Sequence, residues 1–370
     1  MKKSILIALT LWAIFSLTGC GDGKTGEGQD GQSRESADAD TVTSSADAKE
    51  TNVVLTEEII ELEKGFSAVR YDKDYGFDKF LSEGGASSDK EVVSFLTENL
   101  LSGMDIDFNG NFFGCSTIAV QTLDGEALFG RNFDWNRCEA MVVLSYPENG
   151  YASISTVNLD FIGQEGPVDM ALKQDEIKTL AALYAPLDGM NEKGLAVSVN
   201  MIQDSASIEQ DTEKPDITTT TAIRLLLDKS ATVDEALELL KRYDMHASMG
   251  MMVHFALADA TGKSVAVEYI ENEMVVTETP ILTNFYLAEG EKNGIGTAQS
   301  HTRYDILAER LKESKAMSVE DVRDALSSVS KGNFGEFEST EWSIVFNQTK
   351  GQAVYYHREN YEQGYAFAFE

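Results

Sequence analysis

The chain has 370 residues, of which 62 are acidic and 30 are basic, and its formal net charge is −32. This acidic excess argues against a nucleic-acid partner, because binding a phosphate backbone needs a concentrated basic surface that the sequence does not offer. The roughly 320 residues that follow an N-terminal leader and linker can bury one large core or two modest ones.

The chain begins with Met1-Lys2-Lys3 and an apolar stretch from Ser4 to Leu17, which closes on Leu17-Thr18-Gly19-Cys20. This pattern predicts a lipoprotein signal peptide over residues 1–19. The apolar run is shorter than the roughly 20 residues that a spanning helix needs, so a retained transmembrane helix is the weaker alternative. We expect a lipid on Cys20 to anchor the exported protein to the extracytoplasmic face of the bacterial cell membrane.

Two segments are expected between the lipid and residue 115. Residues 20–51 hold the lipidated cysteine and an acidic, Gly- and Ser-rich stretch without aromatic residues, which predicts a disordered linker. Within residues 52–114, the stretches 54–66 and 89–101 place apolar residues at helical spacing. We therefore expect a small helical pro-segment over 52–114, ahead of a catalytic domain over 115–370.

After residue 115 the sequence alternates blocks of strand and helix patterns. Strands are expected at 117–123, 126–133, 140–146, 151–157, 254–258, 264–270, 274–277, 342–347 and 353–356. Helices are expected at 175–184, 219–229, 233–243, 302–313 and 319–330. Runs of strands separated by paired helices, without strict alternation, predict an α+β fold in which antiparallel sheets are layered with helices.

The first two of these strands carry a thiol, a guanidinium and a carboxylate, on Cys115, Arg131 and Asp134. If Asp124-Gly125 is a two-residue hairpin turn, Cys115 lies opposite Asp134, and directly opposed side chains share a face within about 5 Å. Arg131 is three positions from Asp134, so it would point to the other face unless the strand bends near Gly130.

The residue types indicate nucleophilic catalysis. A cysteine attacks a carbonyl as the thiolate, which a neighbouring guanidinium favours. An N-terminal α-amine, whose pKa is near 8, can accept the thiol proton without a histidine. Cys115 has such an amine only after cleavage of the Gly114-Cys115 bond, and a glycine there leaves its carbonyl open to the thiol. A buried structural cysteine and a disulfide with Cys138 are the alternatives, and the disulfide would consume the nucleophile.

From about Phe112 to the C-terminus the chain is similar to linear-amide hydrolases of the N-terminal-nucleophile superfamily. These include choloylglycine hydrolase, penicillin V acylase, and the acid ceramidase and N-acylethanolamine amidase relatives. Four ordered blocks carry the resemblance: Cys115, Arg131 and Asp134 at spacings of sixteen and nineteen residues; 188–195 with the strand that ends in Asn200; 281–284; and 300–304. The resemblance implies a four-layer αββα sandwich of antiparallel sheets.

The same resemblance implies a role for each site residue. Cys115 would be the nucleophile and, through its amine, the base, while Arg131 and Asp134 would stabilise the thiolate and the amine. The side chains that would line the oxyanion, orient the substrate or amine and complete the polar ring are Asn200, Asn284 and Arg303. Strand alternation also places Asn200 away from an apolar face. A turn asparagine and a surface arginine are the alternatives for the other two.

No cofactor is expected, and no metal, because the four histidines lack metal-ligand spacing. About 94 residues separate Cys20 from Cys115. This resembles the ceramidase and acylethanolamidase branch, in which a pro-segment is cleaved but stays associated, and it favours a lipid-like amide.

The leading hypothesis is hydrolysis of a small-molecule N-acyl amide through a thioester on Cys115. An acyltransferase that uses the same acyl-enzyme and a non-catalytic lipoprotein binding module are the alternatives. The acyl group, the amine and a homo-oligomeric state stay open.

Overall fold

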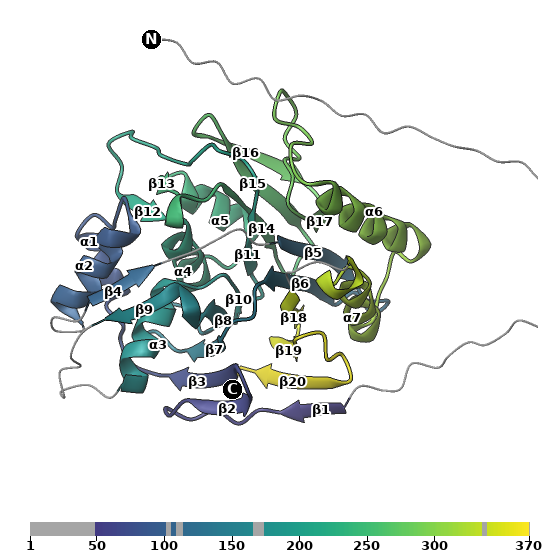
Figure 1. Cartoon of the computed structure of the whole chain (residues 1–370), viewed down its shortest axis with the longest axis horizontal. Coiled ribbons are helices and arrows are strands. Elements are labelled where there is room, and N and C mark those ends of the chain that lie inside the picture. Colours follow the sequence, from purple (N-terminus) through teal and green to yellow (C-terminus); the bar gives the residue numbers. More distant parts are fainter. Residues whose placement is uncertain (1–48, 101–104, 109–113, 166–173, 335–338, 370) are drawn as a thin grey trace, which may run out of the picture. The chain divides into compact units, whose positions relative to one another are not determined.

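The computed structural model describes residues 49–100, 105–108, 114–165, 174–334 and 339–369 (Figure 1). Within these residues a seven-stranded sheet runs in the order β1-β20-β19-β18-β6-β5-β17, with β1 and β20 parallel and the other pairs antiparallel. The strands are β1 (Lys49–Asn52), β20 (Gln363–Ala368), β19 (Gln352–His357), β18 (Ser339–Asn347), β6 (Ala127–Trp135), β5 (Gly114–Gln121) and β17 (Ile281–Leu282).

A nine-stranded sheet, again within the described residues, runs in the order β16-β15-β14-β11-β10-β8-β7-β3-β2. Its strands are β16 (Glu273–Glu278), β15 (Ser264–Ile270), β14 (Val253–Ala258), β11 (Ala196–Met201), β10 (Asp188–Asn191), β8 (Ser153–Asn158), β7 (Ala140–Ser145), β3 (Phe66–Tyr71) and β2 (Ile60–Glu63). Strand β11 of this sheet contacts β5 of the first, so the two sheets face each other there.

Helices cover the outer faces of both sheets (Figure 1). The helices α3 (Gln174–Tyr184) and α4 (Thr219–Lys229) pack on the nine-stranded sheet, and α5 (Val233–Leu240) packs on α4. The helices α6 (Ala298–Glu313) and α7 (Val319–Ser328) pack on the seven-stranded sheet. This αββα arrangement confirms the expected α+β sandwich, and every strand and helix predicted after residue 115 has a counterpart.

Both faces of the inner strands are covered, which explains why every residue of β6 and of β11 is buried. Two smaller pairs complete the fold: β12 (Asp216–Thr218) with β13 (Asp244–His246), and β4 (Asp105–Phe108) with β9 (Ile162–Glu165).

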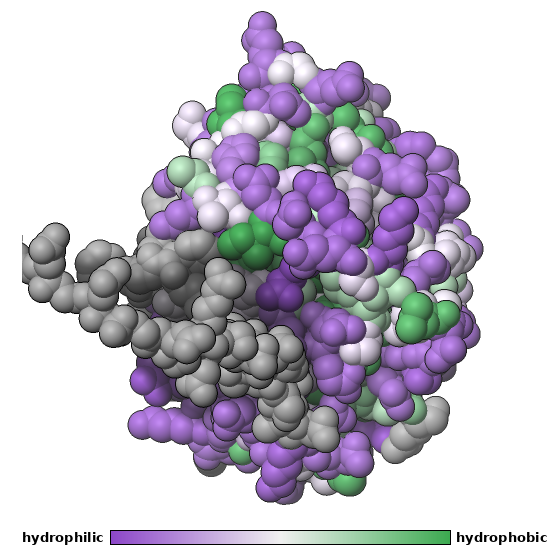
Figure 2. Space-filling view, turned by 90° about the vertical axis from the view of Figure 1, so that its right-hand side faces the viewer, coloured by the Kyte–Doolittle hydropathy of each residue, from purple (hydrophilic) through white to green (hydrophobic). Residues whose placement is uncertain are grey.

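Among the described helices, none combines the length and apolarity that crossing a membrane requires. The face in Figure 2 is mostly hydrophilic, with small separate hydrophobic areas, as the acidic composition leads us to expect.

The segment ahead of Cys115 is not the purely helical one that we predicted. The stretch expected as a helix over 54–66 contains β2, and β3 follows from Phe66, with a turn at Gly65, whose φ is 85°. Strand β3 lies parallel to β7, so pairing within the sheet overrides the local helical spacing. The other expected helix is confirmed as α2 (Asp89–Asn99), whose N-cap is Ser88. A further helix, α1 (Phe77–Ser82), precedes it.

This segment is built into the rest of the fold. Strand β3 belongs to the nine-stranded sheet, and the Tyr75 hydroxyl donates to the buried Asp228 carboxylate at 2.6 Å. Residues 49–51, which we expected to be the disordered end of the linker, instead belong to β1 and pair with β20. The described residues before and after Cys115 fall within one compact unit. The segment is therefore continuous in structure with the domain that follows it. The leader, Cys20 and the linker up to residue 48 lie outside the described residues.

Candidate active site

The hairpin between β5 and β6 sets the geometry of the site. The Thr122 N–H donates to the Glu126 carbonyl at 2.8 Å, which leaves a three-residue loop, Leu123 to Gly125. Gly125 has a φ of 82°, the left-handed conformation that ends a three-residue hairpin loop. The expected two-residue turn is therefore wrong by one residue.

The corrected register moves the site residues relative to one another. Cys115 pairs with Phe133, and Asp134 pairs with Gly114. Because a slip of one residue exchanges the two faces of a strand, Cys115 now shares its face with Arg131, and Asp134 points to the other face. The bend near Gly130 that we expected is not required. Arg131 is brought to the thiol by regular strand geometry, whereas Asp134 lies beside Gly114 on the opposite face.

Arg131 is fully buried and held from several directions. Its Nε donates to Asp188 Oδ2 at 3.1 Å, its Nη1 to Asn200 Oδ1 at 2.8 Å, and its Nη2 to the Val199 carbonyl at 3.0 Å. The Cys115 Sγ lies 3.7 Å from the same Val199 carbonyl. These contacts fix the guanidinium next to the thiol. Strand alternation placed Asn200 away from an apolar face, and in the structure its side chain contacts Arg131 of the other sheet.

The backbone of Cys115 is held by two side chains from other elements. Its N–H donates to Asn284 Oδ1 at 2.8 Å, and its carbonyl accepts a hydrogen bond from Arg303 Nη1. Arg303 Nη2 also donates to Asn284 Oδ1 at 2.7 Å, while Asn284 Nδ2 donates to the Met201 carbonyl at 2.6 Å. Arg303 is buried, so the alternative of a surface arginine is wrong. Asn284 lies at a bend, but it is buried and its side chain holds the Cys115 nitrogen.

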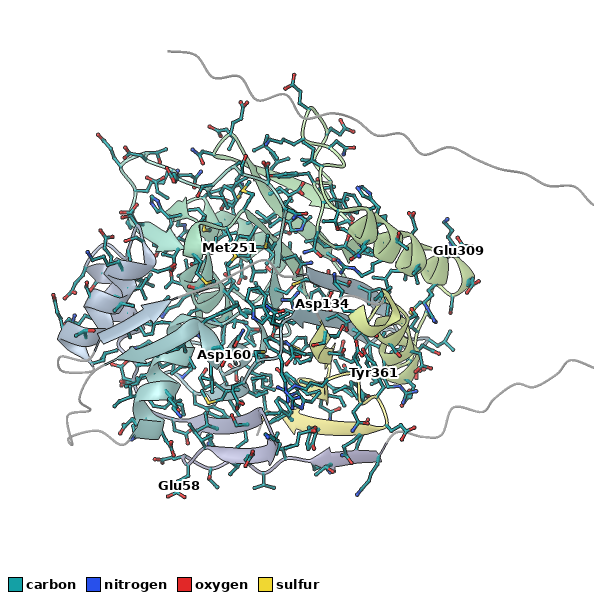
Figure 3. All side chains as sticks on the ribbon, in the orientation of Figure 1. Glu58, Asp134, Asp160, Met251, Glu309 and Tyr361 are labelled. Atoms are coloured by element: carbon teal, nitrogen blue, oxygen red, sulfur yellow. The ribbon has the colours of Figure 1, made fainter. Side chains whose placement is uncertain are left out.

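Asp134 occupies the other side of the junction. Its Oδ1 accepts from the Thr340 hydroxyl at 2.7 Å, and its Oδ2 lies 3.4 Å from Arg303 Nη1. A Cβ built on Gly114 would lie 3.0 Å from Asp134 Oδ2, so the carboxylate borders the residue on the N-terminal side of the predicted cut. Figure 3 shows Asp134 in the interior between the helical layers, whereas Glu58 and Glu309 lie at the periphery.

Burial dominates the electrostatics of the site. It raises the pKa of the Cys115 thiol, a rise that the Arg131 cation opposes. It likewise raises the pKa of Asp134, against the cations of Arg303 and Lys331. The Cys115 side chain is fully buried in the uncut chain. Burial thus favours the neutral thiol, whereas the neighbouring Arg131 cation favours the thiolate.

Two other sequence features lie elsewhere. Cys138 is a separate free thiol, and its N–H donates to Glu341 Oε2 at 2.9 Å. The His301 ring stacks on Phe285 at 4.0 Å between centroids, and its Nε2 bonds to the Gly294 carbonyl. In the part of the chain that the structure describes, no cluster of His, Cys, Asp and Glu has the form of a metal site.

Sequence reasoning missed Asp188, which pairs with Arg131 and accepts from Trp342 Nε1 at 2.9 Å. The residue opens the second block of the resemblance, so the block located it but did not reveal its partner. Ser300 was also missed: its hydroxyl accepts from the Asn284 N–H at 2.6 Å. The first turn of α6 thus supports the asparagine that holds Cys115, and the 300–304 block was the signal.

The fold and site define a class of protein: an αββα sandwich of the N-terminal-nucleophile hydrolase type, with a buried cysteine on an inner strand. Residues 115–285 match the family described as linear amide C–N hydrolases, choloylglycine hydrolase family. Over this segment, which is less than half of the chain, the protein is similar to the choloylglycine hydrolase family.

Individual relatives agree with this assignment. Bile salt hydrolase/transferase of Clostridium perfringens is 29% identical over 180 residues, which is 46% of this chain and 53% of the relative. Penicillin V acylase of Pectobacterium atrosepticum is 31% identical over 100 residues, 24% of this chain and 26% of the relative. The chain thus spans about half of the first relative and about a quarter of the second.

The structural comparison concerns the fold. A crystal structure of a mutant conjugated bile acid hydrolase from C. perfringens superposes with a TM-score of 0.52 at 21% identity, covering 69% of this chain and 92% of that chain.

Proposed function

We propose that this protein hydrolyses the linear amide bond of small N-acyl compounds through a thioester on Cys115. The observation that carries the proposal is the buried cluster around this one residue. Arg131 lies on the face of its thiol, and Asn284 and Arg303 hold its backbone nitrogen and carbonyl. The match of residues 115–285 to a family of linear amide C–N hydrolases supports the same reaction.

The proposed mechanism requires cleavage of the Gly114-Cys115 bond. The nitrogen that donates to Asn284 in the uncut chain then becomes an α-amine, whose pKa near 8 suits it to accept the thiol proton. The nitrogen and sulfur belong to the same residue, so no separate histidine base is needed. If the Cys115 thiol itself cleaves this bond, it attacks the Gly114 carbonyl in the same way as it attacks the amide carbonyl of a substrate.

Turnover would follow in four steps. The α-amine takes the proton of Cys115, and Sγ forms a bond to the amide carbonyl carbon, whose oxygen becomes negative. Arg131 favours the thiolate, and the Asn200 amide is the candidate donor to that oxygen, a contribution worth roughly 3 kcal/mol. The amine of the substrate leaves with the proton that the α-amine had taken. Water then attacks the thioester, which releases the acid and restores the thiol.

Replacement of Cys115 by Ala tests the proposal. We expect the variant to lose amide hydrolysis and to stay uncut, as measured by product analysis, intact mass and N-terminal sequencing. Cys138→Ala, which changes the other described cysteine, is the matched control and should keep both activities. A Cys115→Ala variant with full turnover would contradict the proposed nucleophile. If the unsubstituted protein stays uncut and does not react with a thiol-directed acyl probe, the result would favour a non-catalytic binding module.

A transferase function is the second candidate, because one relative is named a hydrolase/transferase. The two functions share the thioester and differ in what attacks it. Incubation with water and a competing amine separates them: free acid as the main product supports hydrolysis, and its absence rejects simple hydrolysis. The relatives are named for bile salts and for penicillin V. We prefer a lipid-like amide as the substrate class, because the long segment ahead of Cys115 resembles that of the ceramidase and acylethanolamidase branch.

We further propose that the protein works on the extracytoplasmic face of a bacterial membrane, tethered through a lipid on Cys20. The support is the leader over 1–19 and its closing Leu17-Thr18-Gly19-Cys20. Cys20→Ala should move the protein from the membrane fraction to the soluble fraction. Retention in the membrane fraction would argue for another mode of attachment.

A further inference from the structure

A buried lysine lies at the predicted cleavage junction, and neither the sequence pattern nor the family assignment gives it a role. Lys331 begins the 3₁₀ helix η3 (Lys331–Phe334) and is 4% exposed. A Cβ built on Gly114 would lie 2.9 Å from Lys331 Cε and 3.0 Å from Asp134 Oδ2. The lysine side chain and the Asp134 carboxylate therefore both border the residue whose carbonyl is to be attacked.

The position of Lys331 is fixed by its surroundings. Its N–H donates to the Thr340 hydroxyl at 2.9 Å, and that hydroxyl donates to Asp134 Oδ1. Its Nζ donates to Gln299 Oε1 at 3.2 Å, in the first turn of α6. The same helix turn carries Ser300, which supports Asn284. The Lys331 ammonium is thus hydrogen-bonded to the helix turn that supports Asn284, and the lysine side chain lies beside Gly114.

Cleavage generates negative charge on Gly114. Sγ of Cys115 forms a bond to the Gly114 carbonyl carbon, and the carbonyl oxygen becomes an anion. The C–N bond then breaks, and the proton lost by the thiol ends on the freed nitrogen, which leaves a thioester and an amine. Water hydrolyses the thioester, restoring the thiol and leaving Gly114 as a carboxylate. Inside a buried site both anions are costly unless a cation is near.

We propose that Lys331 assists the self-cleavage step by stabilising the negative charge that forms on Gly114. Arg131 and Arg303 contact the thiol side and the Cys115 carbonyl, whereas Lys331 borders Gly114 itself. The lysine therefore serves cleavage of the chain more than turnover of substrate, which requires no Gly114. This inference rests on the proposed function, because it presupposes that the bond is cut.

Two substitutions separate charge from shape. Lys331→Met keeps the length and packing of the aliphatic chain but removes the charge, whereas Lys331→Arg keeps the charge and changes the shape. The control is Lys312→Met, on an α6 lysine whose side chain is 72% exposed. Each full-length chain is made by cell-free synthesis, and cleavage is followed in time by intact mass. Turnover is measured per cut chain with an N-acyl amide that the unsubstituted protein hydrolyses.

Lys331→Met should slow cleavage about 100-fold, the lower end of the effect of losing one donor to a developing oxyanion. Lys331→Arg should cut within about threefold of the unsubstituted chain, because charge stabilises the anion. Turnover per cut chain should change by less than about threefold in both, since substrate hydrolysis does not use Gly114. Cleavage of Lys331→Met at the normal rate, or an equal loss of cleavage and turnover, would overturn the proposal.

The outcomes distinguish this inference from the function on which it rests. An unsubstituted chain that is active but never cut would overturn both. A chain that is cut normally with and without the Lys331 charge would overturn only the inference. Thermal unfolding of Lys331→Met in a Cys115→Ala background, where every chain stays uncut, checks folding. If that variant does not fold, the comparison of Lys331→Gln with Lys331→Arg replaces it: equal cleavage rates overturn the inference, and faster cleavage with arginine supports it.

Discussion

The pair formed by Arg131 and Asp188 allows a quantitative test, because both side chains are fully buried and 3.1 Å apart. Replacing Arg131 with Met leaves the Asp188 carboxylate buried with Trp342 Nε1 as a remaining donor at 2.9 Å. Breaking a buried ion pair by removing one partner costs about 3–5 kcal/mol. For a domain of roughly 320 residues, with an unfolding entropy of about 2 cal/mol/K per residue, that corresponds to a fall in Tm of roughly 4–8 °C.

The loss of folding stability in Arg131→Met should depend on pH. Burial already raises the pKa of Asp188, against the opposing effect of Arg131, and loss of the arginine raises it further. The folded state then retains a proton that the unfolded state releases at about pH 4, so the stability of Arg131→Met falls as pH rises above that value. Adding Asp188→Asn removes the titrating group. The double variant should therefore regain at least half of the lost stability and show no extra pH dependence.

The assay is thermal unfolding by circular dichroism at pH 5 and pH 8, in a Cys115→Ala background that keeps every variant as one chain. Turnover is measured separately in chains that retain Cys115. We expect the Arg131→Met/Asp188→Asn protein to be stable yet nearly inactive, because it restores charge balance without restoring a cation beside the thiol. If Arg131→Met melts within about 2 °C of its parent, the ion-pair argument is wrong. If the double variant regains turnover, Arg131 does not act on Cys115.

Two further predictions concern neighbouring parts of the site. Burial alone would raise the pKa of Glu268, but His254 at 3.0 Å and two backbone amides lower it. The ionised Glu268 therefore stabilises the folded protein above about pH 4, and this stabilisation is lost as the pH falls through the folded-state pKa. Glu268→Gln should cost about 1–3 kcal/mol at pH 7 and flatten the acid limb of the stability curve, measured by urea unfolding; an unchanged acid limb would contradict this. Gly114→Val should slow self-cleavage roughly 100-fold, because its Cβ would meet side-chain atoms at 2.9 and 3.0 Å. Intact mass measures the rate, and normal cleavage would show that the junction is not tightly packed.

The candidate site was predictable as a set of residues but not as a geometry. Cys115, Arg131 and Asp134 were identified from spacing, and the structure places Arg131 beside the Cys115 thiol but Asp134 on the opposite face, beside Gly114. Their faces were misassigned because one glycine, Gly125, adopts a left-handed conformation and lengthens the loop by a residue. The sequence Asp124-Gly125 fits both a two-residue and a three-residue loop, and the choice reverses which side chains share a face.

The longer strands and helices after residue 115 were predicted because their apolar patterns match their burial, whereas the short strands and the last strand, β20, were not. The segment ahead of residue 115 was not predicted correctly, since β3 is stabilised by parallel pairing with β7, a contact between residues distant in sequence. Local spacing carries no information about such pairing. Asp188 was missed for the same reason: its partner Arg131 lies on the other sheet. Each error concerns a contact that only the assembled sandwich creates.

The contacts of Asn284 lead to a final prediction about the base. Its Oδ1 accepts from both the Cys115 nitrogen and Arg303, and its Nδ2 donates to a carbonyl, so the orientation of the amide is fixed. After cleavage an uncharged α-amine can donate to Oδ1 and keep its lone pair for the thiol proton. Asn284→Asp would place a carboxylate at this position, and an opposite charge favours the ammonium form. The acid limb of the kcat/KM profile should therefore shift to higher pH. A profile that keeps its position would show that the amine of Cys115 is not the titrating base.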